Sequence, residues 1–143
     1  MSQLVRISEA ASLAMHTMAI LGQSPQRRFT NQELADRLRA SGHHLAKVMQ
    51  RLVKAGYVDS VRGPQGGFCL GRPAHSLTLL AIFEVVEGPV GDGGCLLSQP
   101  ICNGHDCALG EVVQSFHRQL RDYLASTTLD QMVERSGLPQ FSI

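Results

Sequence analysis

The sequence lacks the features that mark several classes of protein. Among its 143 residues no run approaches the roughly 18 apolar residues of a membrane span, so we expect no membrane association. The first fifteen residues lack the charged-then-apolar pattern of a signal peptide, which makes the cytoplasm the expected compartment. Internal repeats and low-complexity segments are also missing. With 43% hydrophobic residues, the chain can form one modest domain with an arm, or a domain that gains a second core by dimerising.

The common motifs of catalysis are missing as well. The sequence contains no Walker loop, no nucleotide-binding G-x-G-x-x-G, no H-E-x-x-H and no G-x-S-x-G elbow. Clustered cysteines and histidines leave a thiol oxidoreductase as an alternative. Such an enzyme commonly uses a C-x-x-C pair to supply a reactive thiol, and that pair is absent too. We therefore predict that the protein is not an enzyme.

The net charge is only +1, but the charges are unevenly distributed. Residues 25–72 contain nine Lys or Arg and three Asp or Glu, a balance of +6. Residues 73–143 contain three Arg and eight acidic residues, a balance of −5. Because a basic region attracts polyanions and an acidic one repels them, the middle of the chain is the expected nucleic-acid-binding part.

The pattern of apolar residues predicts three helices in the first part of the chain, over residues 7–21, 30–38 and 43–56. Ser8 is a plausible N-cap of the first helix, and Gly22 is its expected end. Thr30 and Glu33 form a capping box at the start of the second helix. We expect the Ser41-Gly42 pair to break the chain before the third.

Two short strands, residues 57–61 and 68–70, are expected around a glycine-rich turn. Two helices with a tight break, followed by such a hairpin, form a helix-turn-helix with a wing. The predicted fold class is therefore mostly α with a small β-hairpin wing. Double-stranded DNA is the expected partner, because the second helix of this motif lies in the major groove.

Several side chains of the second helix can read or hold DNA, namely His43, His44, Lys47, Gln50 and Arg51. Lys47 and Arg51 can donate to guanine or to phosphate, and Gln50 can pair with adenine through two hydrogen bonds. In the turn of the hairpin, Arg62 stands on a stiff, closely approachable segment. Since narrow minor grooves attract arginine, we expect Arg62 to enter one.

A cysteine-rich segment, residues 88–107, comes after a predicted buried helix over residues 77–86. It contains Cys95, Cys102 and Cys107, and no helical or strand period fits it. Cytoplasmic thiols stay reduced, so a clustered trio indicates metal binding or redox sensing and not structural disulfides. An iron–sulfur cluster, a zinc ion and a thiol redox switch all remain open, because three thiolates suit each of them.

The next helix, expected over residues 109–125, carries an apolar stripe with few partners left in its own chain. We therefore predict a homodimer that pairs through this helix. A last short helix is expected over residues 129–135. The predicted organisation is a winged-helix domain (residues 1–87), a sensing loop (88–107), and a dimerisation helix with a tail (108–143).

The run HHLAKVMQRLVKAGYVDSVRGPQGGFCLGRP, residues 43–73, resembles the small bacterial winged-helix regulators of the Rrf-two family, which includes IscR, NsrR and CymR. Residues 7–21 and 77–88 share this resemblance, which spans residues 5 to about 125. It implies a homodimer that reads a palindromic operator. In many members an iron–sulfur cluster on three loop cysteines alters DNA affinity. The resemblance implies DNA contacts from the helix residues His43, Lys47, Gln50 and Arg51, and from the wing residues Arg62, Gly63 and Gln65.

The cysteine loop departs from the family pattern in two ways. The second gap between cysteines, four residues, is shorter than in cluster-binding relatives. Relatives take a fourth ligand from an acidic residue of the first helix or from a histidine after the last cysteine, where this chain has Ser12 and Gly110. The candidates for the fourth ligand are Glu9, His105, Asp106 and Glu111. The cluster type, 2Fe-2S or 4Fe-4S, stays undecided, with zinc as the alternative.

Overall fold

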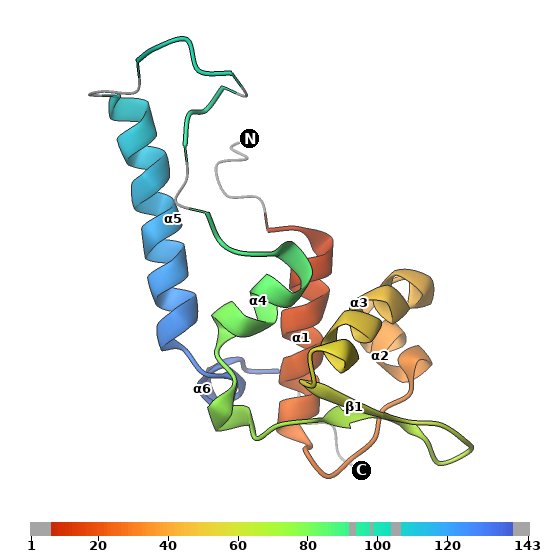
Figure 1. The fold of residues 1–143 in the computed structure, drawn as a ribbon. Helices are drawn as coiled ribbons and strands as arrows, with labels where there is room; N and C mark the ends of the chain where they lie inside the picture. Colours follow the sequence, from red (N-terminus) through yellow and green to blue (C-terminus); the bar gives the residue numbers. More distant parts are fainter. Residues whose placement is uncertain (1–6, 92–93, 98, 104–106, 139–143) are drawn as a thin grey trace.

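The computed structural model describes residues 7–91, 94–97, 99–103 and 107–138, and it has the predicted architecture (Figure 1). A two-stranded antiparallel hairpin accompanies the helices. The elements in chain order are α1 (Glu9–Gln23), α2 (Asn31–Leu38), α3 (Gly42–Lys54), β1 (Val58–Val61), β2 (Gly67–Leu70), the 3₁₀ turn η1 (Ala74–Ser76), α4 (Leu79–Glu87), α5 (Ala108–Ser126) and α6 (Leu129–Arg135). The prediction of a mostly helical fold with a hairpin wing is confirmed.

The first helices begin where the capping residues predict. The Ser8 hydroxyl accepts a hydrogen bond from the backbone N–H of Ala11 at 3.1 Å, and Thr30 forms the expected capping box with Glu33. The turn between α2 and α3 lies earlier than predicted. Arg39 takes a left-handed conformation with φ 52°, whereas Ser41 is already the N-cap of α3. The break therefore depends on an arginine in a conformation that usually favours glycine or asparagine.

The prediction that α1 ends at Gly22 is wrong. The helix continues through this residue to Gln23. A Cβ atom at Gly22 would lie only 3.0 Å from Cγ2 of Val133, a residue of α6. Gly22 thus allows α6 to pack closely across α1 and does not stop the helix.

The wing is a regular hairpin whose register pairs Val58 with Leu70 and Val61 with Gly67. Its turn requires glycine, because a Cβ atom at Gly66 would lie 2.1 Å from the carbonyl oxygen of Val61. Phe29 forms a bridge with Phe68 in which the two residues exchange backbone hydrogen bonds of 2.8 and 2.9 Å. This bridge fixes the base of the wing beside the start of α2.

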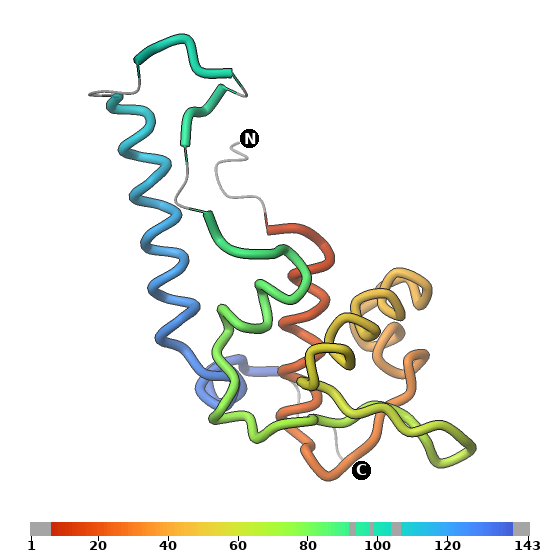
Figure 2. Tube along the Cα trace, in the orientation of Figure 1, coloured from red at the N-terminus to blue at the C-terminus, as the bar shows by residue number. Residues whose placement is uncertain are grey.

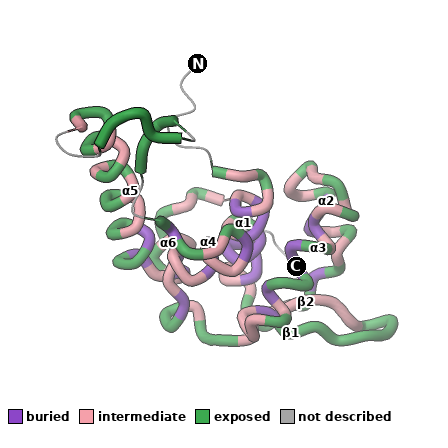
Figure 3. Tube along the Cα trace, turned by 45° about the horizontal axis from the view of Figure 1, so that its top comes forward, coloured by how far each residue is buried: buried purple, intermediate pink, exposed green. Residues whose placement is uncertain are grey.

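Helix α1 is the centre of the core. Eight of its fifteen residues are buried, and it packs against α3, α4 and α6 (Figure 3). Two backbone hydrogen bonds between the segment before α4 and the segment before α6 position α6. The N–H of Leu79 donates to the carbonyl of Thr127, and the N–H of Leu129 donates to that of Leu77. As a result α6 packs back on the winged-helix body.

Helix α5 stands apart from this body. Of its nineteen residues only Leu124, near the end that joins α6, is buried. Figure 2 shows the described parts of the cysteine loop rising from the end of α4 to the far end of α5, from which α5 runs back to the body. The structure therefore presents a compact body (residues 7–87 with α6) and a projecting arm (the cysteine loop with α5).

Candidate nucleic-acid interface and cysteine site

The exposed face of α3 carries one stripe of polar and basic side chains. Leu45, Val48, Met49 and Leu52 are buried and fix the opposite face of the helix. The residues exposed at helical spacing are His43, Lys47, Gln50, Arg51 and Lys54. The first four were predicted as DNA contacts. Lys54 was missed, although its spacing of seven residues from Lys47 places it on the same stripe.

Two predicted DNA contacts have partners in the protein: His44, at the edge of this stripe, and Arg51, on it. Nδ1 of His44 lies 3.6 Å from Oε2 of Glu9, the first residue of α1. Nη1 of Arg51 donates to the carbonyl oxygen of Val86, at the end of α4, at 2.8 Å. His44 therefore contacts α1 and Arg51 contacts α4, although Arg51 is exposed.

The wing supplies the other half of the candidate interface. Arg62, Gly63 and Gln65 are exposed in its turn, and the hairpin projects from the body (Figure 1). Between wing and α3 lies a hollow of about 440 Å³, whose lining includes Lys54 and Ser60. A protruding helix and a protruding hairpin with a hollow between them can follow a groove of duplex DNA and its backbone.

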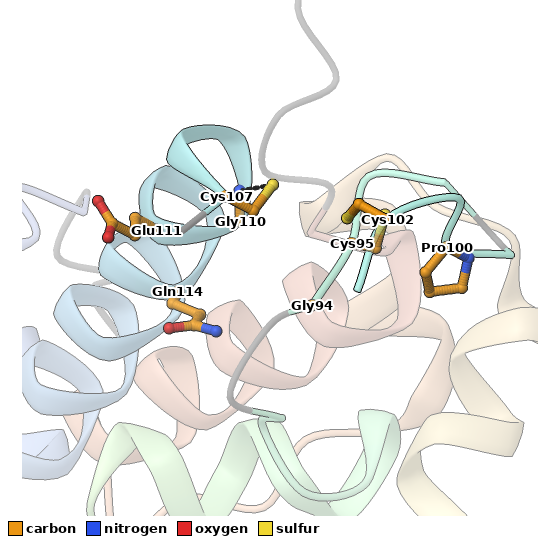
Figure 4. Close-up of a pocket in the computed structure, with 8 residues that line it drawn as sticks. All are labelled: Gly94, Cys95, Pro100, Cys102, Cys107, Gly110, Glu111 and Gln114. Carbon is orange, nitrogen blue, oxygen red and sulfur yellow. Dashed lines mark hydrogen bonds between the residues drawn. The ribbon is translucent and has the colours of Figure 1, made fainter. Parts of the chain in front are cut away.

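The three loop cysteines surround one hollow of about 370 Å³ (Figure 4). Cys95 and Cys102 come from the loop, and Cys107 comes from the start of α5. Glu111 also lines the hollow, but Figure 4 shows its carboxylate pointing away from Cys95 and Cys102. A donor set of three thiols around a single space suits a soft metal or an iron–sulfur cluster.

The three thiols differ in how firmly they are held. Cys107 is the N-cap of α5, and its Sγ accepts a hydrogen bond from the N–H of Gly110 at 3.3 Å. Cys95 and Cys102 are exposed on irregular backbone. Within the described ranges, no three side chains of His, Cys, Asp or Glu form a ready metal-binding group. Binding therefore requires the loop to bring Cys95 and Cys102 toward the fixed Cys107.

The candidates for a fourth ligand are distributed over several places. Glu111 is the candidate that lines the hollow with the thiols. Glu9 is exposed at the start of α1 and lies beside His44. His105 and Asp106 fall outside the described residues.

A cluster of contacts at the beginning of the cysteine loop was not predicted. Val90 is buried, its N–H donates to Oε1 of Glu84 at 3.3 Å, and its carbonyl accepts a hydrogen bond from Arg121 of α5. The hydroxyl of Ser8 donates to Glu87 at the end of α4. These interactions have no sequence signature, because they join segments that belong to different elements of the fold.

The apolar residues of α5, which the sequence placed on one stripe, divide into two. Val113, Leu120 and Leu124 are half-buried or buried, and the last two belong to the core or pack against it. The other stripe is exposed and consists of Leu109, Val112, Phe116 and Tyr123. Its steps of three, four and seven residues match the a and d positions of a helix pair.

A helix-turn-helix with an exposed basic stripe, a projecting wing and a further helix that carries an unpaired apolar stripe define a winged-helix DNA-binding regulator. The Rrf2 family model, described as an iron-dependent transcriptional regulator, matches residues 7–135. The chain belongs to this family, which is the Rrf-two family that the sequence resembles. None of the helices in the described part of the chain has the length and apolar character of a membrane span.

Individual relatives agree with this assignment. BadM of Rhodopseudomonas palustris, named as an HTH-type transcriptional regulator, is 32% identical over 127 residues, which cover 87% of this chain and 76% of BadM. The structure of CymR, the global cysteine regulator of B. subtilis, superposes with a TM-score of 0.76 at 24% identity, covering 91% of this chain and 97% of CymR. The structure of T. potens IscR has a TM-score of 0.73 at 22% identity and covers 97% and 93%. These comparisons confirm the prediction of a transcriptional regulator and not an enzyme.

Proposed function

We propose that this regulator acts in the cytoplasm as a homodimer on a palindromic operator, and that an iron–sulfur cluster held by Cys95, Cys102 and Cys107 sets its DNA affinity. The observation that carries the proposal is that three thiols from two separate elements, the loop and the start of α5, line one hollow. Three soft donors around one space can hold such a cluster once the loop brings Cys95 and Cys102 toward Cys107.

The proposed DNA contacts come from the exposed stripe of α3 and from the wing. Gln50 suits an adenine edge, whereas Lys47 and Lys54 suit guanine or phosphate. His43, in the first turn of α3, would face base edges, because early residues of a recognition helix do so. Arg62 would enter the minor groove, with Gly63 and Gln65 close to the backbone.

The proposed dimer forms through the exposed stripe of α5. Four large apolar side chains in helical register on a projecting helix are costly to leave in water, and a second copy of the same stripe can cover them. A two-fold dimer would also present two copies of α3, as a palindromic operator requires.

In the loaded protein, Cys95, Cys102 and Cys107 would be three of the ligands. Among the candidates for the fourth ligand, Glu111 is the one that lines the same hollow in the described structure. A bound cluster supplies redox- and ligand-sensitive iron chemistry. The chain's own part is to order the loop: Cys107 is fixed at the start of α5, so holding all three thiols brings the segment around Cys95 and Cys102 against that helix.

A zinc site or a thiol redox switch is the second candidate. Cys95 and Cys102 favour it, because both are exposed and line the same hollow, where two thiols of one loop can be oxidised as a pair. In this case the same loop would respond to oxidants or to zinc, with the DNA-binding part unchanged.

The test begins with anaerobically purified wild-type protein, its UV–visible spectrum, and its iron, sulfide and zinc contents. We expect visible absorbance with iron and sulfide in the wild type, and loss of both in Cys102→Ser with the fold and dimer intact. Cys69→Ser is the matched control, because Cys69 lies on β2 outside the hollow. Wild-type protein that contains only zinc would exclude the cluster and leave the second candidate.

A further inference from the structure

We infer that Arg51 is a positioning residue that connects the recognition helix to the base of the cysteine loop, and is not a ligand of DNA. The inference rests on the proposed function, because it states how a change in the cysteine loop alters the position of the DNA-binding helix. Its basis is the hydrogen bond from Arg51 to the carbonyl of Val86, together with the contacts that meet around this carbonyl.

The end of α4 is completed by a residue of α3. The last carbonyls of a helix have no partner within the helix, and a cationic side chain at this end satisfies them and complements the helix dipole. Val86 is the second-last residue of α4, and Nη1 of Arg51 lies 2.8 Å from its carbonyl oxygen. Arg51 therefore caps α4 from a different helix.

The segment directly after α4 is held on two sides. The chain turns at Gly88 with φ 76° and then reaches Val90. The N–H of Val90 donates to Glu84 of α4, and its carbonyl accepts from Arg121 of α5. Because Val90 is buried, the base of the cysteine loop cannot move without disturbing both helices.

Both ends of the cysteine loop are attached to α5. Cys107 caps this helix, and Val90 is bonded to Arg121 on the same helix. A change in the loop between them acts on Val90, then on the last turn of α4, and then on Arg51 and α3. The described contacts join α5, Val90, the end of α4 and Arg51, and so connect the base of the loop to the DNA-binding face.

The neighbouring pair of His44 and Glu9 is a weaker link. The side chain of Glu9 is 69% exposed and its oxygen lies 3.6 Å from the imidazole nitrogen, so solvent screens the interaction. A guanidinium that donates at 2.8 Å to a fixed carbonyl is the stronger constraint on α3. Arg51 is therefore the residue to change.

The experiment compares Arg51→Gln with Lys54→Gln, which removes the same charge from the exposed stripe of the same helix. It begins with cluster-free protein, so that the result does not depend on any cofactor. We expect Arg51→Gln to leave the salt dependence of DNA binding unchanged and to speed amide exchange at Gly88 and Val90 at least about threefold. Lys54→Gln should reduce the salt slope by about one and leave this exchange unchanged. A reduced slope with unchanged exchange in Arg51→Gln would overturn the inference and make Arg51 a phosphate contact.

The second readout is the ratio of DNA affinities between the loaded and cluster-free states. In the wild type we expect a ratio of about tenfold or more, and Arg51→Gln should lower this ratio to less than about threefold. Arg51→Lys should restore part of the ratio. Lys54→Gln should weaken DNA binding in both states and leave the ratio unchanged. A wild-type ratio of one would refute the proposed function, and the slope and exchange would still decide the role of Arg51. A full wild-type ratio that persists in Arg51→Gln would refute the inference alone.

Discussion

The body and the arm of this molecule are both built on helices with apolar faces, but those faces are covered to opposite degrees. In the body, eight of the fifteen residues of α1 are buried. In the arm, one of the nineteen residues of α5 is buried, and four large apolar side chains on that helix are exposed. The body has its partners within the chain, whereas the arm presents exposed thiols and an exposed apolar stripe, for which we propose a cofactor and a second subunit. In the proposed function the DNA-reading face is thus preformed, and pairing and response depend on what the arm binds.

The largest expected effect is in the body. Phe29 is 0% exposed, and the guanidinium carbons of Arg27 and Arg37 lie 4.5 and 5.0 Å from the centre of its ring. Phe29→Ala leaves a cavity and should lower the free energy of unfolding by about 3–5 kcal/mol in urea titrations. Phe116→Ala, an aromatic change in the arm where the ring is 41% exposed, is the control. The two variants are compared at concentrations where the chain is monomeric. Equal losses of unfolding free energy would contradict the contrast between body and arm.

The next effect should appear in assembly. Val112→Lys combined with Phe116→Lys places two charges on the exposed stripe of α5 and should weaken the dimer at least about a hundredfold, about 2.8 kcal/mol, as measured by sedimentation. Val113→Lys with Leu120→Lys changes the inner stripe instead. This pair should also disturb the contact of α5 with the body, which a lower thermal midpoint would reveal. A dimer that survives the first pair of substitutions would place the pairing surface elsewhere.

Substitutions in α3 and in the wing should affect DNA affinity in different ways. Lys47→Ala should weaken binding to all sequences alike and reduce the salt slope by about one. Arg62→Ala should cost on the order of 1–3 kcal/mol, mainly on sites with a narrow A·T-rich minor groove. Fluorescence anisotropy with A·T-rich and G·C-rich sites at several salt concentrations measures both. Equal losses on every site from both variants would refute the minor-groove role of Arg62.

The smallest effect concerns the start of α2. The N–H of Thr30 donates to Oε2 of Glu33 and, with the charge of Arg27, holds the pKa of this carboxyl below its ordinary value of 4.5 despite some burial. A lowered pKa means that the ionised carboxyl stabilises the fold above pH 4.5, and that this stabilisation disappears as the pH falls through the folded-state pKa. Glu33→Gln should cost roughly 0.5–1 kcal/mol at neutral pH and less in acid. An equal cost at both pH values would assign the effect to packing.

Local features of the fold could be predicted because their causes are local. The N-caps Ser8 and Thr30, the hairpin and the exposed stripe of α3 each depend on residues within a few positions of one another. The bridge of Phe29 to Phe68 and the packing of α6 against Gly22 could not be predicted, since they join distant segments. The apolar period of α5 placed Val113 and Phe116 on a single stripe, because a sequence does not show which side of a helix meets the body.

The candidate site shows the same limit. Spacing singled out Lys47, Gln50 and the three loop cysteines as candidates, because residue type and position are enough to suggest DNA or a soft metal. Spacing also grouped Arg51 with the DNA contacts, since it lies one turn from Lys47. Its partner, the carbonyl of Val86, is a backbone group in another helix and has no signature in the sequence.

The most direct test of the central claim, that the arm sets the affinity of the body, uses one wild-type preparation and one salt concentration. Operator DNA obtained by selection from random sequences is titrated with the cluster-loaded protein and with the same protein after cluster removal, with sedimentation to confirm that both remain dimeric. We predict affinities that differ at least about tenfold, or about 1.4 kcal/mol. Equal affinities of two intact dimers would contradict the claim.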